Sequence, residues 1–180
     1  IRDRHRFAYV GNDLQDIFGI DPKHIGDATG ISNAYFGNNN AVETLKALEG
    51  QRDGILVSEE MVKDFQLRQG DTINLRLQDA RDHKYHIVPF RFVGIAREFP
   101  TAPKDSFLVA NAGYIAEKTA NSASEIVLMH AAGNPANLAA EVKNTLGTSD
   151  VQVSDIGSVQ KLINSSLTSV DLHGLTSLEL

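Results

Sequence analysis

Three groups of polar residues carry side chains of the kinds that chemistry requires. The first is Asp82, His83 and His86, which supply imidazole and carboxylate groups that bind metal ions. Side chains alternate along a strand, so the spacing of three between the histidines places them on opposite faces, with Lys84 between them. The pattern therefore favours a solvated hairpin tip, and we predict no metal ligands.

The other two groups are candidates for acid–base or nucleophilic catalysis. Glu59 and Glu60 are adjacent carboxylates, which point about 100° apart on a helix, and their position at a helix start explains them through the helix dipole. Lys104, Asp105 and Ser106 supply an amine, an acid and a hydroxyl, but consecutive residues rarely converge on one reacting atom. We therefore predict no catalytic residues and no enzymatic activity.

Composition excludes several further classes of function. The 180 residues include no cysteine, which excludes disulfides, thiol nucleophiles and thiolate metal ligands. The sequence has neither G-x-G-x-x-G nor a P-loop motif, so no cofactor is predicted. A net charge of −6 lacks the basic footprint of a nucleic-acid-binding protein.

The most regular part of the chain runs from Asp53 to Pro100. Ile55 to Val57 form a short β-prone run, and Ser58 then caps a helix. A turn at Gly70 and Asp71 leads into a strand over 72–77, whose apolar residues alternate with polar ones. A second strand is expected over 85–96, apolar enough to bury much of both faces, with Pro89 at an edge or bulge.

The flanking regions give weaker patterns. A strand is expected over 5–10 and a helix over 42–48 with Val42, Leu45 and Leu48 on one face. A loop over 101–106 leads to a strand over 107–110 and a helical turn over 114–118. After them, a strand over 125–130, a helix over 135–146 capped by Asn134 and ended by Gly147, and a strand over 151–154 form a βαβ-like unit.

The order of motifs between residues 50 and 160 resembles the extracytoplasmic core domain of FtsX-like (MacB-type) permease subunits of ABC transporters. The residues that carry the resemblance are Gly54 to Val57, Ser58 to Glu60, Leu67, Gly70 to Thr72, Phe92 to Ile95, Phe99 and Pro100. The resemblance is specific in order and spacing, although each motif alone is common.

This resemblance implies an α+β fold with two lobes. A βαβ-like lobe is expected from residues 1–51 and 125–160, with a small β-rich lobe of residues 52–124 inserted into it. Residues 161–180 are expected to form an amphipathic stalk helix that leads towards a membrane segment. The chain itself has no apolar run near the roughly 18 residues of a membrane helix. It begins at Ile1 without a methionine, and we expect the missing membrane helices to flank both ends.

The resemblance also implies a function without covalent chemistry. Such a domain lies on the extracytoplasmic face of the bacterial cell membrane and couples cytoplasmic ATP hydrolysis mechanically to export or extraction of a lipid, lipoprotein, peptide or drug, or to activation of a partner. The partners implied are an ATP-binding cassette ATPase subunit, a second permease copy, and an extracytoplasmic protein or lipid-linked substrate.

Two surfaces are candidates for partner contacts. Phe99, Pro100 and Pro103 lie in an exposed-looking aromatic and proline loop, and loops of this kind also serve as plain structural turns. Leu167 and Val170 belong to an apolar stripe over 158–180, which either docks on its own domain or forms the stalk.

Two other classes of function stay open. One is a stand-alone module that binds a small ligand or peptide, because the Gly70-Asp71 turn signature also occurs in unrelated small β domains. The other is a hydrolase with a dispersed site, because catalytic residues need only meet in space.

We predict that the isolated chain shows no ATPase, esterase or peptidase turnover above background, because it has neither a nucleotide-binding loop nor a convincing nucleophile. Steady-state assays with ATP, an activated ester and a casein substrate test this. Saturable hydrolysis that survives repurification and is lost in a point mutant would favour the hydrolase.

Overall fold

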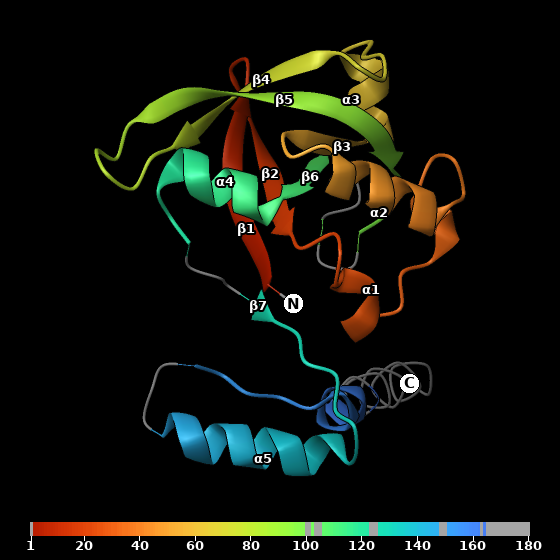
Figure 1. Cartoon of the computed structure of the whole chain (residues 1–180), viewed down its shortest axis with the longest axis vertical. Coiled ribbons are helices and arrows are strands. Elements are labelled where there is room, and N and C mark those ends of the chain that lie inside the picture. The colour runs from red at the N-terminus through yellow and green to blue at the C-terminus, as the bar shows by residue number, and fades with distance from the viewer. Residues whose placement is uncertain are drawn as a thin grey trace, which may run out of the picture. The chain divides into compact units, whose positions relative to one another are not determined.

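The computed structural model describes residues 2–99, 102, 106–122, 126–147, 151–162 and 164 (Figure 1). Contacts divide the chain into two compact units, Ile1–His130 and Ala131–Leu180. Within the described part, none of the helices combines the length and apolar character that crossing a membrane requires.

The first unit is built on a sheet that closes on itself. The strand order is β2-β6-β3-β5-β4-β1-β7, and β1 also pairs with β2, which completes a circuit of six strands. The strands are β1 (Arg2–Val10), β2 (Asp13–Ile20), β3 (Gly54–Ser58), β4 (Thr72–Gln78), β5 (Tyr85–Ala96), β6 (Phe107–Asn111) and β7 (Ile126–Val127). The helices of this unit are α1 (Ile25–Ala28), the 3-10 helix η1 (Asn33–Tyr35), α2 (Ala41–Gly50), α3 (Glu59–Asp64) and α4 (Ala112–Thr119).

An apolar core fills the inside of the closed sheet. Burial alternates strictly along β4, where Ile73, Leu75 and Leu77 are buried and the residues between them are exposed. They pack with residues from the other five strands of the circuit, including Ala8, Ile17, Ile55, Val57, Val88, Phe90, Phe92, Leu108 and Ala110. Helix α4 adds Tyr114, whose ring packs edge-on against Phe90 with centroids 5.2 Å apart.

A second apolar layer covers the outer face of β3 and β6. All five residues of β3 are buried, because Leu56 faces outward against Leu48 of α2 and Phe36. Val109 of β6 belongs to the same layer. Strands covered on both faces appear in sequence as continuous apolar runs, which explains why β3 and β6 are recognisable despite their lack of alternation.

The loop before α2 is fixed on β5. Gly37 N donates to Ile95 O at 2.9 Å, and a Cβ at Gly37 would lie 2.8 Å from the Ile95 Cβ, so the backbone passes too close for a side chain. Asn40 then caps α2, since its side chain accepts from Glu43 N at 3.1 Å.

The segment over 53–99 folds in the predicted order. Ser58 accepts from Met61 N at the start of α3, and Gly70 adopts a positive φ of 94° before β4. Strand β5 spans Tyr85–Ala96 as predicted. The strand and helical turn expected over 107–118 are also confirmed, as β6 and α4.

Two details of β5 qualify the prediction. Strand β3 pairs with β5 only from Arg91 to Ala96, so Pro89 has a sheet neighbour on one side only, as an edge position requires. The expectation that β5 buries much of both faces is wrong for its first half. There residues 85–87 are all exposed, with Ile87 at 70%, and buried residues alternate with exposed ones only from Val88.

The apolar face expected for the 42–48 helix is wrong at Val42, whereas Leu45 and Leu48 pack on the outer apolar layer as expected. Val42 is 63% exposed, whereas Ala41, Thr44 and Leu48 are buried. The helix begins at Ala41, whose N–H donates to the side chain of Asn33 at 3.0 Å. The buried face therefore begins at Ala41 and includes Thr44 and Leu48, and Val42 lies outside it.

The expected βαβ-like unit is only partly present. Helix α5 (Pro135–Leu146) is confirmed, with Asn134 accepting from Ala136 N and Gly147 at a positive φ of 61°. The strand expected over 125–130 is limited to β7, because β1 offers it only Arg2 and Asp3 as partners. Residues 151–154 form no strand, and no described strand pairs with them.

The fold class α+β is confirmed, but the compact units differ from the expected division. The boundary between the two compact units falls after His130 in the sequence. The expected boundaries were different: one lobe of residues 1–51 and 125–160, and an inserted lobe of residues 52–124. The reason is strand pairing. Strand β1 pairs with β4, and β2 pairs with β6, so residues 2–20 and 54–111 share one sheet.

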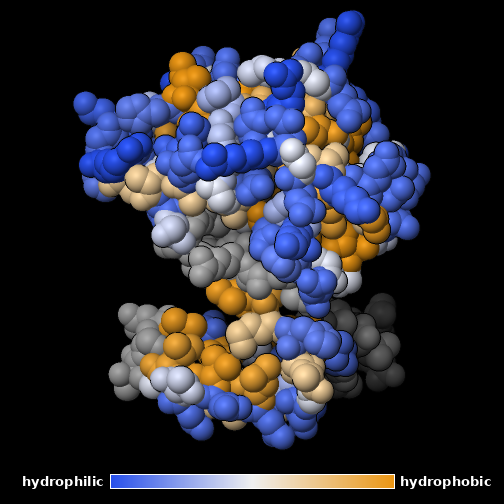
Figure 2. Space-filling model, in the orientation of Figure 1, coloured by the Kyte–Doolittle hydropathy of each residue, from blue (hydrophilic) through white to orange (hydrophobic). Residues whose placement is uncertain are grey.

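The second unit contains α5 and a helical stretch over 156–162. No residue of α5 is buried, and Ile156 and Leu162 are 63% and 70% exposed. Apolar side chains are prominent on this unit in Figure 2. The rest of the expected stalk, including Leu167 and Val170, lies outside the described residues.

We predict that Leu75→Asp lowers the free energy of unfolding by on the order of 3 kcal/mol or more, because it buries an unpaired charge inside the closed sheet. Asn74→Asp is the matched control, since the neighbouring position is exposed, and we expect a change within about 0.5 kcal/mol. Thermal and urea melts measure both. Equal stability of the two variants would contradict the orientation of β4.

Candidate functional site

The hairpin between β4 and β5 brings together the polar residues that the sequence marks for chemistry. Its loop is closed by two backbone hydrogen bonds, from Asp79 N to Lys84 O and from His83 N to Asp79 O, each 2.9 Å long. His83 has a positive φ of 57°. A polar residue in the left-handed region is common in turns, so this loop folds without a glycine.

Asp79 is the buried acid of the loop, with 4% of its surface exposed. Its carboxylate accepts from the backbone N–H of Arg81 at 2.8 Å and from the Arg81 Nε at 2.9 Å, and it also contacts the Arg81 Nη2. Side-chain and backbone hydrogen bonds from Arg81 hold the pKa of the Asp79 carboxyl well below its ordinary value. Asp79 is therefore ionised across the neutral range and is not a proton donor.

Two of the three candidate metal ligands contact each other. His86 Nε2 lies 2.8 Å from Asp82 Oδ2, and Lys84 N donates to Asp82 Oδ1 at 2.9 Å. The backbone hydrogen bond from Lys84 and then the side-chain bond to His86 lower the pKa of Asp82. Among the described residues, no three His, Asp or Glu side chains gather into a group that could hold a metal ion.

A hollow of about 360 Å³ lies beside this loop. It is lined by Leu77, Gln78, Asp79, Ala80, His83, Tyr85 and Asn121. The hairpin and the chain that follows α4 therefore form its walls together, and Ala80 N donates to Thr119 O at 2.9 Å, which ties the two walls to each other. The lining mixes apolar, aromatic and amide groups with the carboxylate of Asp79, which Arg81 holds, and the imidazole of His83.

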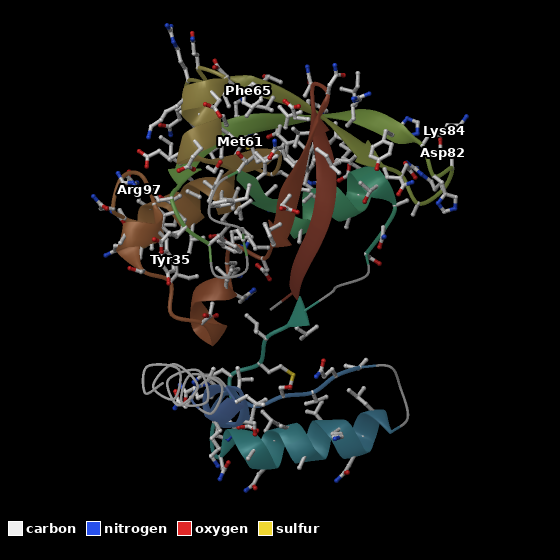
Figure 3. All side chains as sticks on the ribbon, turned by 180° about the vertical axis from the view of Figure 1, so that it is seen from behind. Tyr35, Met61, Phe65, Asp82, Lys84 and Arg97 are labelled. Carbon is white, nitrogen blue, oxygen red and sulfur yellow. The ribbon has the colours of Figure 1, made fainter. Side chains whose placement is uncertain are left out.

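A second polar cluster surrounds Arg97. Its guanidinium lies 3.6 Å from Glu59 and donates to the side chain of Asn39 at 3.1 Å and to the Gly37 carbonyl at 3.3 Å. Its backbone N–H donates to Tyr35 O at 2.7 Å. Arg97 thus holds α3, the loop before α2 and the end of β5 together, and Figure 3 shows Tyr35 and Arg97 on the same side of the unit.

The carboxylates at the start of α3 have structural partners. Glu59 lies 3.8 Å from Lys63, one turn later on the same helix, in addition to its contact with Arg97. Glu60 is exposed. Both residues lie in the first turn of α3, where the helix dipole favours negative charge. Of the third candidate group, Lys104 and Asp105 lie outside the described residues, and Ser106 directly precedes β6.

The expected partner-contact loop differs from its prediction at Phe99. This side chain is 8% exposed and its ring packs against Phe18, with centroids 5.9 Å apart, so the expectation of an exposed aromatic is wrong there. The reason is that Phe99 belongs to the outer apolar layer, together with Phe18 of β2 and Phe107 and Val109 of β6. Pro100 and Pro103 lie outside the described residues, and a partner contact by this loop stays a prediction.

No family model matches the chain, and no curated protein matches it. A solved domain described as part of a permease protein from Porphyromonas gingivalis is similar at 10% identity with a TM-score of 0.42. The match covers 81% of this chain and 60% of that one, so the chain spans less than two thirds of its length. A likeness at this level supports no conclusion about function.

We predict that Asp79→Asn lowers the melting temperature of the chain by a few degrees, about 2–5 °C, because Arg81 loses its ionised partner. The folded-state pKa of Asp79 is depressed, so the stabilisation is complete above the unfolded pKa of about 4 and is lost as the pH falls below it. Melts of both proteins between pH 7 and pH 2 test this. A difference that grows on acidification would contradict the assigned ion pair.

Proposed function

We propose that this chain is the extracytoplasmic domain of an FtsX-like, MacB-type permease subunit of an ABC transporter. In this role it transmits movement and performs no covalent chemistry. The proposal rests on the motif order over 53–99, which resembles that family. The resemblance depends on the order strand, capped helix, turn and two strands. This segment folds into those elements in that order.

The observation that carries the proposal is how the chain enters and leaves the first unit. Arg2 and Asp3 of β1 pair with Val127 and Ile126 of β7 in antiparallel register. The two ends of the unit therefore lie side by side as hydrogen-bonded strands. Neighbouring ends of this kind suit an extracytoplasmic domain held between two membrane segments, and they also occur in many other domains.

The path of β1 shows how movement at these ends would spread. The strand is nine residues long. It pairs with β2 from Arg4 to Val10, and its last two residues, Tyr9 and Val10, also pair with β4. A force that displaces β1 acts on the hydrogen bonds to β2 and to β4 at the same time. A closely packed core resists deformation. The first unit would therefore move as a rigid body, with differential contacts in two states of the transporter.

Several finer statements belong to this proposal. The partners are an ATP-binding cassette ATPase subunit, a second permease copy, and an extracytoplasmic protein or lipid-linked substrate. The site of action is the extracytoplasmic face of the bacterial cell membrane. A MacB-type division into two lobes is a further part of the proposal, and its boundaries would differ from the compact units described above. Helical residues 156–162 would then continue as a stalk.

The first test is the native gene around this segment. We expect stretches of about 20 apolar residues on both sides, as membrane helices require. A reading frame without such stretches would contradict the proposal.

The second test interrupts the mechanical link in the complete gene product with its ATPase. We predict that six Gly and Ser residues inserted after Met129 reduce substrate movement roughly tenfold while ATP hydrolysis continues, because a longer, flexible linker transmits less force. The same insert after Gly30, an exposed position with open space around it, is the matched control and should leave transport intact. Equal transport by both insertion variants would contradict mechanical coupling through this connection.

A further inference from the structure

The first half of β5 has one open edge. Strand β4 pairs with β5 from Tyr85 to Arg91, but β3 pairs with it only from Arg91 onward. Residues 85–90 therefore have a sheet neighbour on one side only. An edge of this kind presents backbone donors and acceptors to which another extended chain can add.

The backbone at Ile87 points towards this open edge. Asp79 N donates to Lys84 O, and Arg91 N donates to Asp53 O on the β3 side. Because hydrogen-bonding directions alternate along a strand, the peptide groups of Ile87 point away from β4, as those of Arg91 do. Within the described residues, Ile87 N–H and C=O have no backbone partner on that side.

The open edge is short and has a defined end. Pro89 has no N–H, and its carbonyl accepts from the Tyr114 hydroxyl at 2.8 Å. Helix α4 thus closes the edge at Pro89, and only residues 85–88 can pair with an incoming strand. Short, interrupted edges limit uncontrolled sheet-to-sheet pairing, so an added segment would be brief.

The hollow described above adjoins this edge. Tyr85 lines the hollow and lies two residues before Ile87 on the same strand. Leu77 and Asn121 contribute apolar and amide surface to the lining, and Asp79 and His83 contribute a carboxylate and an imidazole. A volume of about 360 Å³ is at the lower end of the range that binds small ligands. It is large enough for side chains of a short peptide that is anchored by backbone pairing.

The charge of the hairpin indicates which peptide fits. Residues 72–91 contain four basic and two acidic residues, a net charge of +2 in a chain whose net charge is −6. Both acids already have partners, since Asp79 pairs with Arg81 and Asp82 with His86. Lys84 is exposed, and Figure 3 shows it with Asp82 at the projecting end of the hairpin.

We infer that the open edge of β5 at Ile87, with the adjoining hollow, binds an extended acidic segment of a partner polypeptide by strand addition. Backbone pairing at Ile87 fixes the register, side chains of the segment enter the hollow, and the basic hairpin selects acidic sequences. This site does not depend on the proposed function, because a permease domain and a stand-alone module can both use it. Its test and that of the proposed function therefore succeed or fail separately.

The first experiment uses two labelled eight-residue peptides in fluorescence anisotropy with the full chain. One alternates Glu and Val, and the other alternates Lys and Val. We expect saturable binding of the acidic peptide, at least roughly tenfold tighter than the basic one. Equal affinities would overturn the inference. Binding of the chain to phosphatidylglycerol vesicles with no binding of the acidic peptide would also overturn it.

A second set of probes tests backbone pairing without altering the protein. N-methylation of the Val amides blocks one edge of the acidic peptide, and N-methylation of the Glu amides blocks the other, because these amides point to opposite sides of a strand. Strand addition uses one edge, so one methylated peptide should lose binding and the other keep it. Equal binding of both methylated peptides would contradict strand addition.

Variants of the chain then locate the site. Ile87→Pro removes the N–H at the open edge without removing a hydrogen bond to β4, and we expect it to weaken peptide binding roughly fivefold. Ile87→Ala keeps this N–H donor, so its affinity for the peptide should change less than about twofold. Lys84→Glu should weaken binding roughly threefold, and Lys46→Glu, an exposed position on α2, is the matched control. Melting curves confirm folding of each variant. Unchanged binding by folded Ile87→Pro and Lys84→Glu variants would place the peptide elsewhere and overturn the inference.

Discussion

The pairing of β1 with β2 is the constraint on which the first unit depends. It runs from Arg4 opposite Gly19 to Val10 opposite Asp13 and closes the circuit of six strands. Closure of the sheet encloses a core. Alternate residues of each strand face this core and are shielded from water. Without closure, Ile17 and Ala8 would lie at two open edges, and the strict alternation of β4 would have no facing layer to pack against.

The outer layer depends on the same closure. The outer faces of β3 and β6 carry Leu56 and Val109, and these apolar residues are covered by α2 and the loop before it. Arg97 and Gly37 hold that cover on β5 through hydrogen bonds and close backbone packing. The result is a body with apolar layers inside and outside the sheet. Such a body suits a part that moves as one piece, as the proposed mechanical function requires.

Local sequence patterns predicted the elements whose burial follows one simple period. The segment over 53–99, β6, α4 and α5 all formed where alternation, capping residues and turns indicated them. Strand β2 was missed because it does not alternate. Its exposed first half is followed by four consecutive buried residues, 17–20. The signal that could have found it is the Gly11-Asn12 turn between two extended runs, which is typical of a two-residue hairpin.

The errors concern features that depend on tertiary contacts. Helix α2 buries Ala41, which docks on Asn33, in place of Val42. Phe99 is buried against Phe18, 81 residues earlier in the chain. The candidate site shows the same limit. Sequence alone indicated a polar hairpin tip, but the open edge at Ile87 follows from where β3 stops pairing with β5. The point at which two strands stop pairing depends on the whole sheet and not on the local sequence.

The central claim is that β1 and β7, the first and last strands of the first unit, pair with each other. An engineered disulfide tests this pairing directly. The chain has no cysteine of its own, so Asp3→Cys with Ile126→Cys gives a single pair at positions that face each other across β1 and β7. Cα atoms of opposed residues lie close enough for a disulfide. The account predicts nearly complete intramolecular oxidation, measured by mass spectrometry under dilute conditions. Free thiols, or bridges only between molecules, would show that the two ends do not meet.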